Sequence, residues 1–124
     1  MNIEEFREYC LSFRGVCDKM PFGRATSEYD RNLLVFCVLD KWFCLVNIDV
    51  FDFCIIKGAP DEIGELQARY DDIRPAYHMN KRHWMNVGFN RGVPDDVIRS
   101  LVKRSYETVV SSLTKKEREK LQTL

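Results

Sequence analysis

The sequence lacks any apolar run approaching the roughly 20 residues that a membrane-spanning helix requires. Its first residues, Met-Asn-Ile-Glu-Glu, carry acids where a secretion signal would carry basic residues. These two absences predict a protein that works in the cytoplasm without a membrane partner.

Patterns that bind metals or phosphates are also missing. The five cysteines include no Cys-x-x-Cys pair, and the two histidines, His78 and His83, stand five residues apart with no cysteine or acid beside them. No glycine-rich phosphate loop is present. We therefore expect no metal, no cofactor and no catalytic residues. The thiols are interpreted as free and packed, while a disulfide or a reactive thiol remains the alternative.

The length and composition are those of one folded domain spanning residues 1–124. A chain of 124 residues can bury about two-thirds of its unfolded surface in a single core. Because 45% of the residues are hydrophobic and 31% are charged, the composition is globular rather than disordered.

Charge is distributed unevenly although it sums to zero. Residues 1–72 hold eight Lys/Arg against fourteen Asp/Glu, a net charge of −6, whereas residues 73–124 hold eleven against five, a net charge of +6. Neutrality argues against indiscriminate binding of polyanions, but a local basic patch remains possible.

The N-terminal segment has the signals of a helix. Asn2 and Glu5 have the spacing of a capping box, so a helix should begin at Ile3, and Gly15 should end it. Residues 16–32 contain Pro21, Gly23 and scattered charges, and we interpret them as a loop.

Two apolar runs, residues 33–39 and 42–48, predict a β-hairpin with Asp40 and Lys41 as its two-residue turn. That register places Val38 opposite Phe43, and Cys37 opposite Cys44 on the other side of the sheet.

The remaining elements follow from similar start and stop signals. A third strand is expected at residues 52–57, and Pro60 should open a helix that ends near Tyr70. The other predicted elements are a strand at residues 84–89, a long helix after Pro94, and a short helix at residues 115–121 capped by Thr114 and Glu117. Short strand connections beside amphipathic helices predict an α+β fold, a two-layer sandwich with a mainly antiparallel sheet.

One basic segment stands out. Residues 73–94 contain four Lys/Arg and both histidines but no acid. Its lysine and arginine side chains can contact phosphates, and the shorter side chains of His78, Asn80 and His83 can donate further hydrogen bonds. Tyr77 and Trp84 either stack on bases or anchor the segment in the core. In the opposing interpretation the aromatic residues pack and the basic residues are merely solvated.

The run from Tyr77 to Trp84, Tyr-His-Met-Asn-Lys-Arg-His-Trp, resembles the hallmark of the MmcQ/YjbR family of small bacterial proteins. The likeness also covers the N-terminal helix, Pro21-Phe22-Gly23, Lys57, Arg74-Pro75 and Val93-Pro94-Asp95. The sequence departs from it at Phe13-Arg14-Gly15, where relatives usually have Leu-Pro-Gly, and Cys37, Cys44 and Cys54 look particular to this chain.

The resemblance implies a two-layer sandwich related in shape to secretion chaperones and frataxin-like domains, and a DNA-binding role without catalysis. DNA is the expected partner, with RNA left open, and a protein-interaction adaptor or a homodimeric module is the alternative. The candidate nucleic-acid-binding residues are Lys57, Arg74, His78, Asn80, Lys81, Arg82 and His83.

Overall fold

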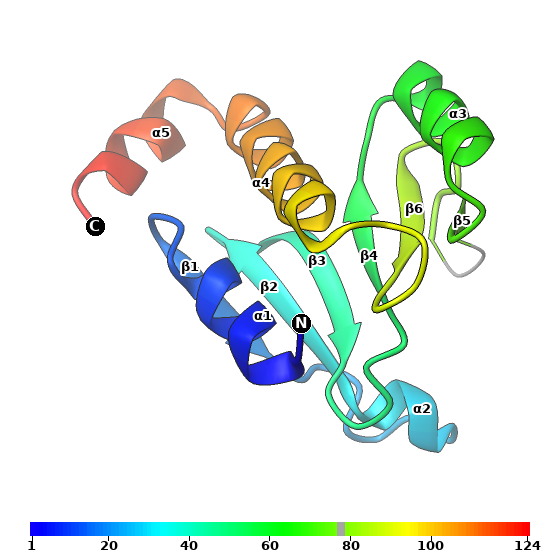
Figure 1. Cartoon of the computed structure of the whole chain (residues 1–124). Coiled ribbons are helices and arrows are strands. Elements are labelled where there is room, and N and C mark those ends of the chain that lie inside the picture. Colours follow the sequence, from blue (N-terminus) through cyan, green and yellow to red (C-terminus); the bar gives the residue numbers. More distant parts are fainter. Residues whose placement is uncertain (77–78) are drawn as a thin grey trace.

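A six-stranded antiparallel sheet is the framework of the protein (Figure 1). The computed structural model describes residues 1–76 and 79–124. Across the sheet the strands run in the order β1-β2-β3-β4-β6-β5. Their bounds are β1 (Val16–Lys19), β2 (Leu33–Val38), β3 (Lys41–Asn47), β4 (Phe53–Lys57), β5 (Ile73–Pro75) and β6 (Trp84–Gly88).

Helices form the second layer. The bounds are α1 (Ile3–Leu11), α2 (Glu28–Arg31), α3 (Pro60–Arg69), α4 (Asp95–Ser111) and α5 (Lys115–Gln122). In Figure 1, α1 and α4 lie across the same face of the sheet, and α4 packs mainly on β3 and β4. The predicted α+β fold, a two-layer sandwich with an antiparallel sheet, is confirmed.

The predicted helix starts are confirmed where a capping box stands in the sequence. At the start of α1 the Asn2 side chain accepts from the Glu5 amide at 2.8 Å, and the Glu5 carboxylate accepts from the Asn2 amide. Thr114 and Glu117 form the same reciprocal pair at the start of α5. Both helices begin at these residues because the caps satisfy amides that have no partner inside a helix.

The interpretation of residues 16–32 as a loop was wrong. Val16–Lys19 forms the edge strand β1 against β2, and Glu28–Arg31 forms the short helix α2, which Ser27 caps. Gly15 has φ +73°, so the chain reverses there directly into β1 instead of entering a loop. β1 has only four residues, of which Val16 and Cys17 are apolar, and these are too few to show a period in the sequence.

The hairpin forms, but its predicted register was wrong. The turn residues are Leu39 and Asp40, both with positive φ (48° and 63°), so Val38 pairs with Lys41 instead of Phe43. Phe36 pairs with Cys44 and Cys37 pairs with Trp42, which leaves Phe43 as an extra residue in β3. This bulge turns the consecutive side chains of Phe43 and Cys44 toward the same core.

Apolar side chains pack on both faces of the sheet. Under the helices the core surrounds Phe6, whose ring makes edge contacts with those of Phe36, Phe51 and Phe89. On the opposite face a smaller cluster, here called the second cluster, comprises Val35, Leu45, Ile55, Ala76 and Trp84, with Phe22, Trp42, Phe53 and Met79 packed around it. Among the helices in the described ranges, none is both long and apolar enough to cross a membrane.

Candidate functional site

The exposed basic residues lie in a tight turn, residues 79–83, that leads into β6. Asn80 organises it: its main-chain carbonyl accepts from the amides of His83 and Trp84, each at 2.9 Å, and its side-chain Oδ1 accepts from the Arg82 amide at 3.1 Å. Lys81, Arg82 and His83 are exposed. Asn80 therefore positions the basic side chains, and its carbonyl oxygens are already used within the turn.

Apolar residues on both sides fix this turn to the sheet. Trp84, only 8% exposed, and Met79 both pack in the second cluster, and the Met79 amide donates to the Ala76 carbonyl at 3.1 Å. Two roles were predicted for Trp84, stacking on bases or anchoring the segment in the core. In the structure Trp84 anchors the segment. Tyr77 and His78, also predicted for this segment, lie outside the described residues.

Lys57 joins the turn from the neighbouring strand. It pairs directly with Trp84 across β4 and β6, and its ammonium lies 5.2 Å from the centroid of the Trp84 ring, the geometry of a cation–π contact. The next amide, that of Gly58, donates to the His83 carbonyl at 3.0 Å. Lys57 and His83 are therefore brought together although 25 residues separate them in the sequence.

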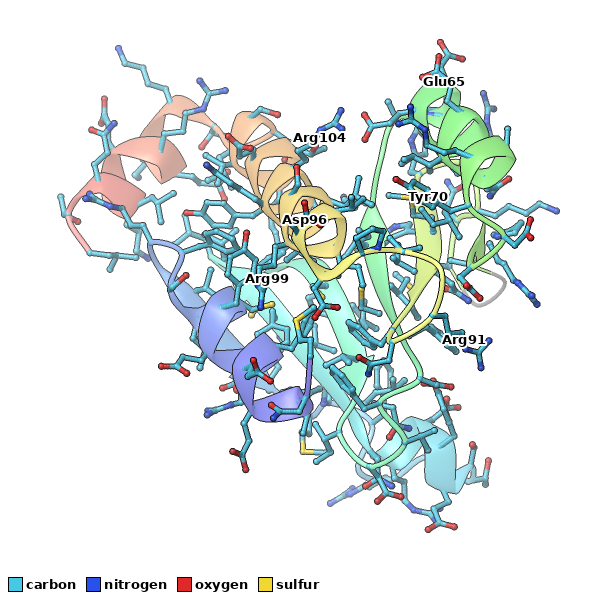
Figure 2. All side chains as sticks on the ribbon, in the orientation of Figure 1. Glu65, Tyr70, Arg91, Asp96, Arg99 and Arg104 are labelled. Carbon is cyan, nitrogen blue, oxygen red and sulfur yellow. The ribbon has the colours of Figure 1, made fainter. Side chains whose placement is uncertain are left out.

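An open depression of about 580 Å³ lies beside this pair. Its lining includes Lys57 and His83, Glu62 at the start of α3, and Arg104 and Glu107 of α4. Arg104 extends from α4 toward α3 (Figure 2), where it pairs with Glu62 at 2.5 Å. Sequence reasoning missed Arg104, and no signal could have found it, because only the packing of α4 brings it beside the turn.

Arg74 occupies a different environment. It lines a separate pocket of about 330 Å³ together with Arg91, Asn86 and the carboxylates of Asp52 and Asp72. Asp72 also pairs with Arg91 at 3.6 Å. The structure thus divides the predicted basic set: Arg74 lines this pocket with Asp52 and Asp72, whereas Lys57 and His83 line the other depression, which Glu62 and Glu107 also line.

The described residues show no assembled metal site. In residues 1–76 and 79–124, no three His, Cys, Asp or Glu side chains gather closely enough to hold an ion. Three of the thiols, those of Cys10, Cys44 and Cys54, are fully buried together. Burial, followed by hydrogen bonds with Cys10 and Cys54, raises the pKa of the Cys44 thiol well above its ordinary value, so this thiol stays protonated and packs as an apolar group.

The model of the YjbR family matches residues 11–108. The chain belongs to the YjbR family. Protein YjbR of Escherichia coli K12 is 28% identical over 122 residues, covering 98% of both chains. Protein YbdF of Escherichia coli O157:H7 is 31% identical over 112 residues, covering 90% of this chain and 84% of its own.

Solved structures with 26–30% sequence identity to this chain have the same fold. Protein DR2400 of Deinococcus radiodurans, whose crystal structure is described as a DUF419 domain, superposes with a TM-score of 0.83 at 30% identity, over 98% of this chain and 88% of its own. A crystal structure of a Pseudomonas syringae protein gives a TM-score of 0.69 at 26% identity, over 87% of this chain and 98% of its own. The family predicted from the Tyr77–Trp84 run is therefore confirmed.

Proposed function

We propose that this YjbR-family chain is a non-catalytic, cytoplasmic nucleic-acid-binding protein with DNA as its partner. Its phosphate-binding surface, here called the basic turn, comprises Lys81, Arg82 and His83 together with Lys57. The observation that carries the proposal is their common placement: three exposed basic side chains on a turn braced by Asn80, with a fourth held beside them on β4.

The pattern of ion pairs supports a surface that is open to an anion. Of the ion pairs formed within residues 1–76 and 79–124, none involves Lys57, Lys81, Arg82 or His83. Arg91 and Arg104, in contrast, are paired with Asp72 and Glu62. A phosphate backbone arriving at the basic turn would not have to displace an internal carboxylate from these four side chains.

The neutral total charge sets the expected strength. Phosphate contacts give affinity that is independent of base sequence and falls with salt. Few contacts on a neutral protein predict modest affinity, because little long-range field attracts the polyanion. Glu62 and Glu107, which line the same depression as Lys57 and His83, weaken the positive field further.

The test is a titration of duplex DNA at several salt concentrations. If Lys57, Lys81 and Arg82 neutralise about three phosphates, affinity should fall roughly fortyfold between 50 and 200 mM monovalent salt, from a slope of about −0.9 per phosphate. The Lys81→Glu/Arg82→Glu double variant should abolish most of this salt-dependent binding.

The matched control is Lys115→Glu/Lys116→Glu. It makes the same change in net charge at two exposed positions of α5, in another part of the fold. Equal losses in the two double variants would show that total charge alone governs binding, and the proposed surface would then be wrong. Absence of DNA binding at 50 mM salt would reject the proposed function. If the chain also self-associated under these conditions, the homodimeric alternative would be favoured.

A further inference from the structure

Two cysteines face each other at the edge of the sheet. Cys17 on β1 and Cys37 on β2 are direct partners in the antiparallel ladder, and their sulfur atoms lie 3.8 Å apart. Cys17 is exposed, whereas Cys37 is only 1% exposed. Cys37 thus has Cys17 on its β1 side and Trp42 on its β3 side, where the register predicted from sequence had placed Cys44.

This geometry is compatible with a covalent bond. Directly paired residues of antiparallel strands have Cα atoms about 4.5–5.5 Å apart, within the range of about 4.4–6.8 Å that disulfides span. The sulfurs must approach to about 2.05 Å. A rotation of the exposed Cys17 side chain can supply part of this approach, and β1 is an edge strand with a single neighbour, β2.

Accessibility distinguishes this pair from the other thiols. Cys10, Cys44 and Cys54 are each 0% exposed, so a reagent in solution meets Cys17 first. Burial, together with the neighbouring Cys17 thiol, raises the pKa of Cys37 to about 11. Cys37 is therefore suited to remain a thiol until Cys17 has been activated beside it.

We propose that Cys17 and Cys37 form a reversible cross-strand disulfide when the protein meets a small disulfide oxidant such as oxidised glutathione. The Cys17 thiolate attacks one sulfur of the oxidant, forming a mixed disulfide and releasing one glutathione thiolate. Cys37 then loses its proton and attacks the Cys17 sulfur, and the second glutathione leaves as a thiolate. The two protein thiols are oxidised by two electrons, and oxidised glutathione is reduced to two molecules of glutathione.

The bond would act on the part of the chain between the two cysteines. Residues 20–32 connect β1 to β2, and within them Phe22 packs on Trp42 and Tyr29 on Phe53, two residues packed around the second cluster. A bond from Cys17 to Cys37 would fasten both ends of this connection and the edge strand β1. Oxidation would thus restrain the residues that cover this part of the second cluster.

The experiment uses the full chain, reduced and then exposed to oxidised glutathione in native buffer. After alkylation and tryptic digestion without reductant, mass spectrometry should find residues 15–19 joined to residues 32–41, two hydrogens lighter than the separate peptides. Trypsin makes this product diagnostic, because cleavage after Arg14, Lys19, Arg31 and Lys41 separates these two peptides from the other three cysteines, which lie on residues 8–14 and 42–57.

Two variants separate the steps. Cys37→Ser should retain one glutathione on Cys17, since no second thiol can displace it, and Cys17→Ser should react far more slowly. The oxidised wild type should unfold at a higher temperature than the reduced protein, with no such rise in either variant. A wild-type protein that keeps a stable glutathione on Cys17, stays unmodified, or gives the joined peptide only in denaturant would overturn the proposal.

Discussion

The hydroxyl of Ser105 donates a hydrogen bond to the main-chain carbonyl of Phe43, 2.6 Å away, inside the core. Phe43 is the extra residue of the β3 bulge, and Ser105 is fully buried on α4. The same hydroxyl accepts from the Lys57 amide at 2.9 Å. One side chain thus ties α4 to the bulge and to the end of β4 that carries Lys57 of the basic turn.

Removing this hydroxyl should weaken the fold. In Ser105→Ala the Phe43 carbonyl and the Lys57 amide both lose a buried partner, so we expect a loss of roughly 1–3 kcal/mol in the free energy of unfolding. Urea denaturation measures it. Ser111→Ala, an exposed change on the same helix, is the control and should stay within about 0.5 kcal/mol of wild type. Equal effects of the two substitutions would contradict a special role for Ser105.

The position of the hairpin turn can be tested with glycine. Asp40 is exposed and has φ +63°, so Asp40→Gly should stabilise the protein by about 0.5–1 kcal/mol by relieving a left-handed conformation. Lys41→Gly should destabilise it by about the same amount, because Lys41 belongs to β3 and pairs with Val38. Thermal unfolding of both variants distinguishes a turn at Leu39-Asp40 from one at Asp40-Lys41. With a turn at Asp40-Lys41, Lys41→Gly would not lower the unfolding temperature.

Glu117 gives the protein a pH-dependent contribution to stability. Its pKa is lowered, first by the hydrogen bond from the Thr114 backbone and to a lesser degree by Lys41, whose ammonium lies 3.8 Å away. A carboxylate with a lowered pKa stabilises the folded state above its ordinary pKa, and this contribution is lost as the pH falls through the lowered value. Glu117→Gln should therefore be less stable than wild type at pH 7.

The comparison is made by unfolding both proteins at pH 7 and at pH 3. The difference between them should shrink at the lower pH, because protonation makes the wild-type side chain resemble the amide. A gap that stays constant or widens on acidification would mean that Glu117 acts only through packing.

Lys57 and Arg74 should differ in their effects on DNA binding. Lys57→Gln should reduce the salt slope by about 0.9, the value for one lost phosphate contact. Arg74→Gln should leave the slope nearly unchanged, because Arg74 lines a pocket with Asp52 and Asp72. Measuring both slopes checks the boundary of the basic turn, and the reverse result would move the phosphate-binding surface to the Arg74 pocket.

Sequence alone determined the elements whose signals are local. The capping pairs Asn2/Glu5 and Thr114/Glu117 predicted two helix starts to the residue, because a cap is a contact between residues three apart. Pro60 likewise predicted the first residue of α3. The Tyr77–Trp84 run identified the family, since that resemblance requires only the order of residues.

Tertiary structure decided what depends on pairing between distant segments. Strand register is set by the turn and the bulge together, so one residue of error placed Cys44 opposite Cys37 on β3, where the structure has Trp42. Cys17, the neighbour of Cys37 on the other side, was missed because β1 itself was interpreted as a loop. Packing also divided the basic residues, placing Arg74 in a pocket with Asp52 and Asp72, and Lys57 with His83 in a depression beside Glu62 and Glu107. Local composition shows that charges are present, but their partners are fixed only when the sheet and α4 come together.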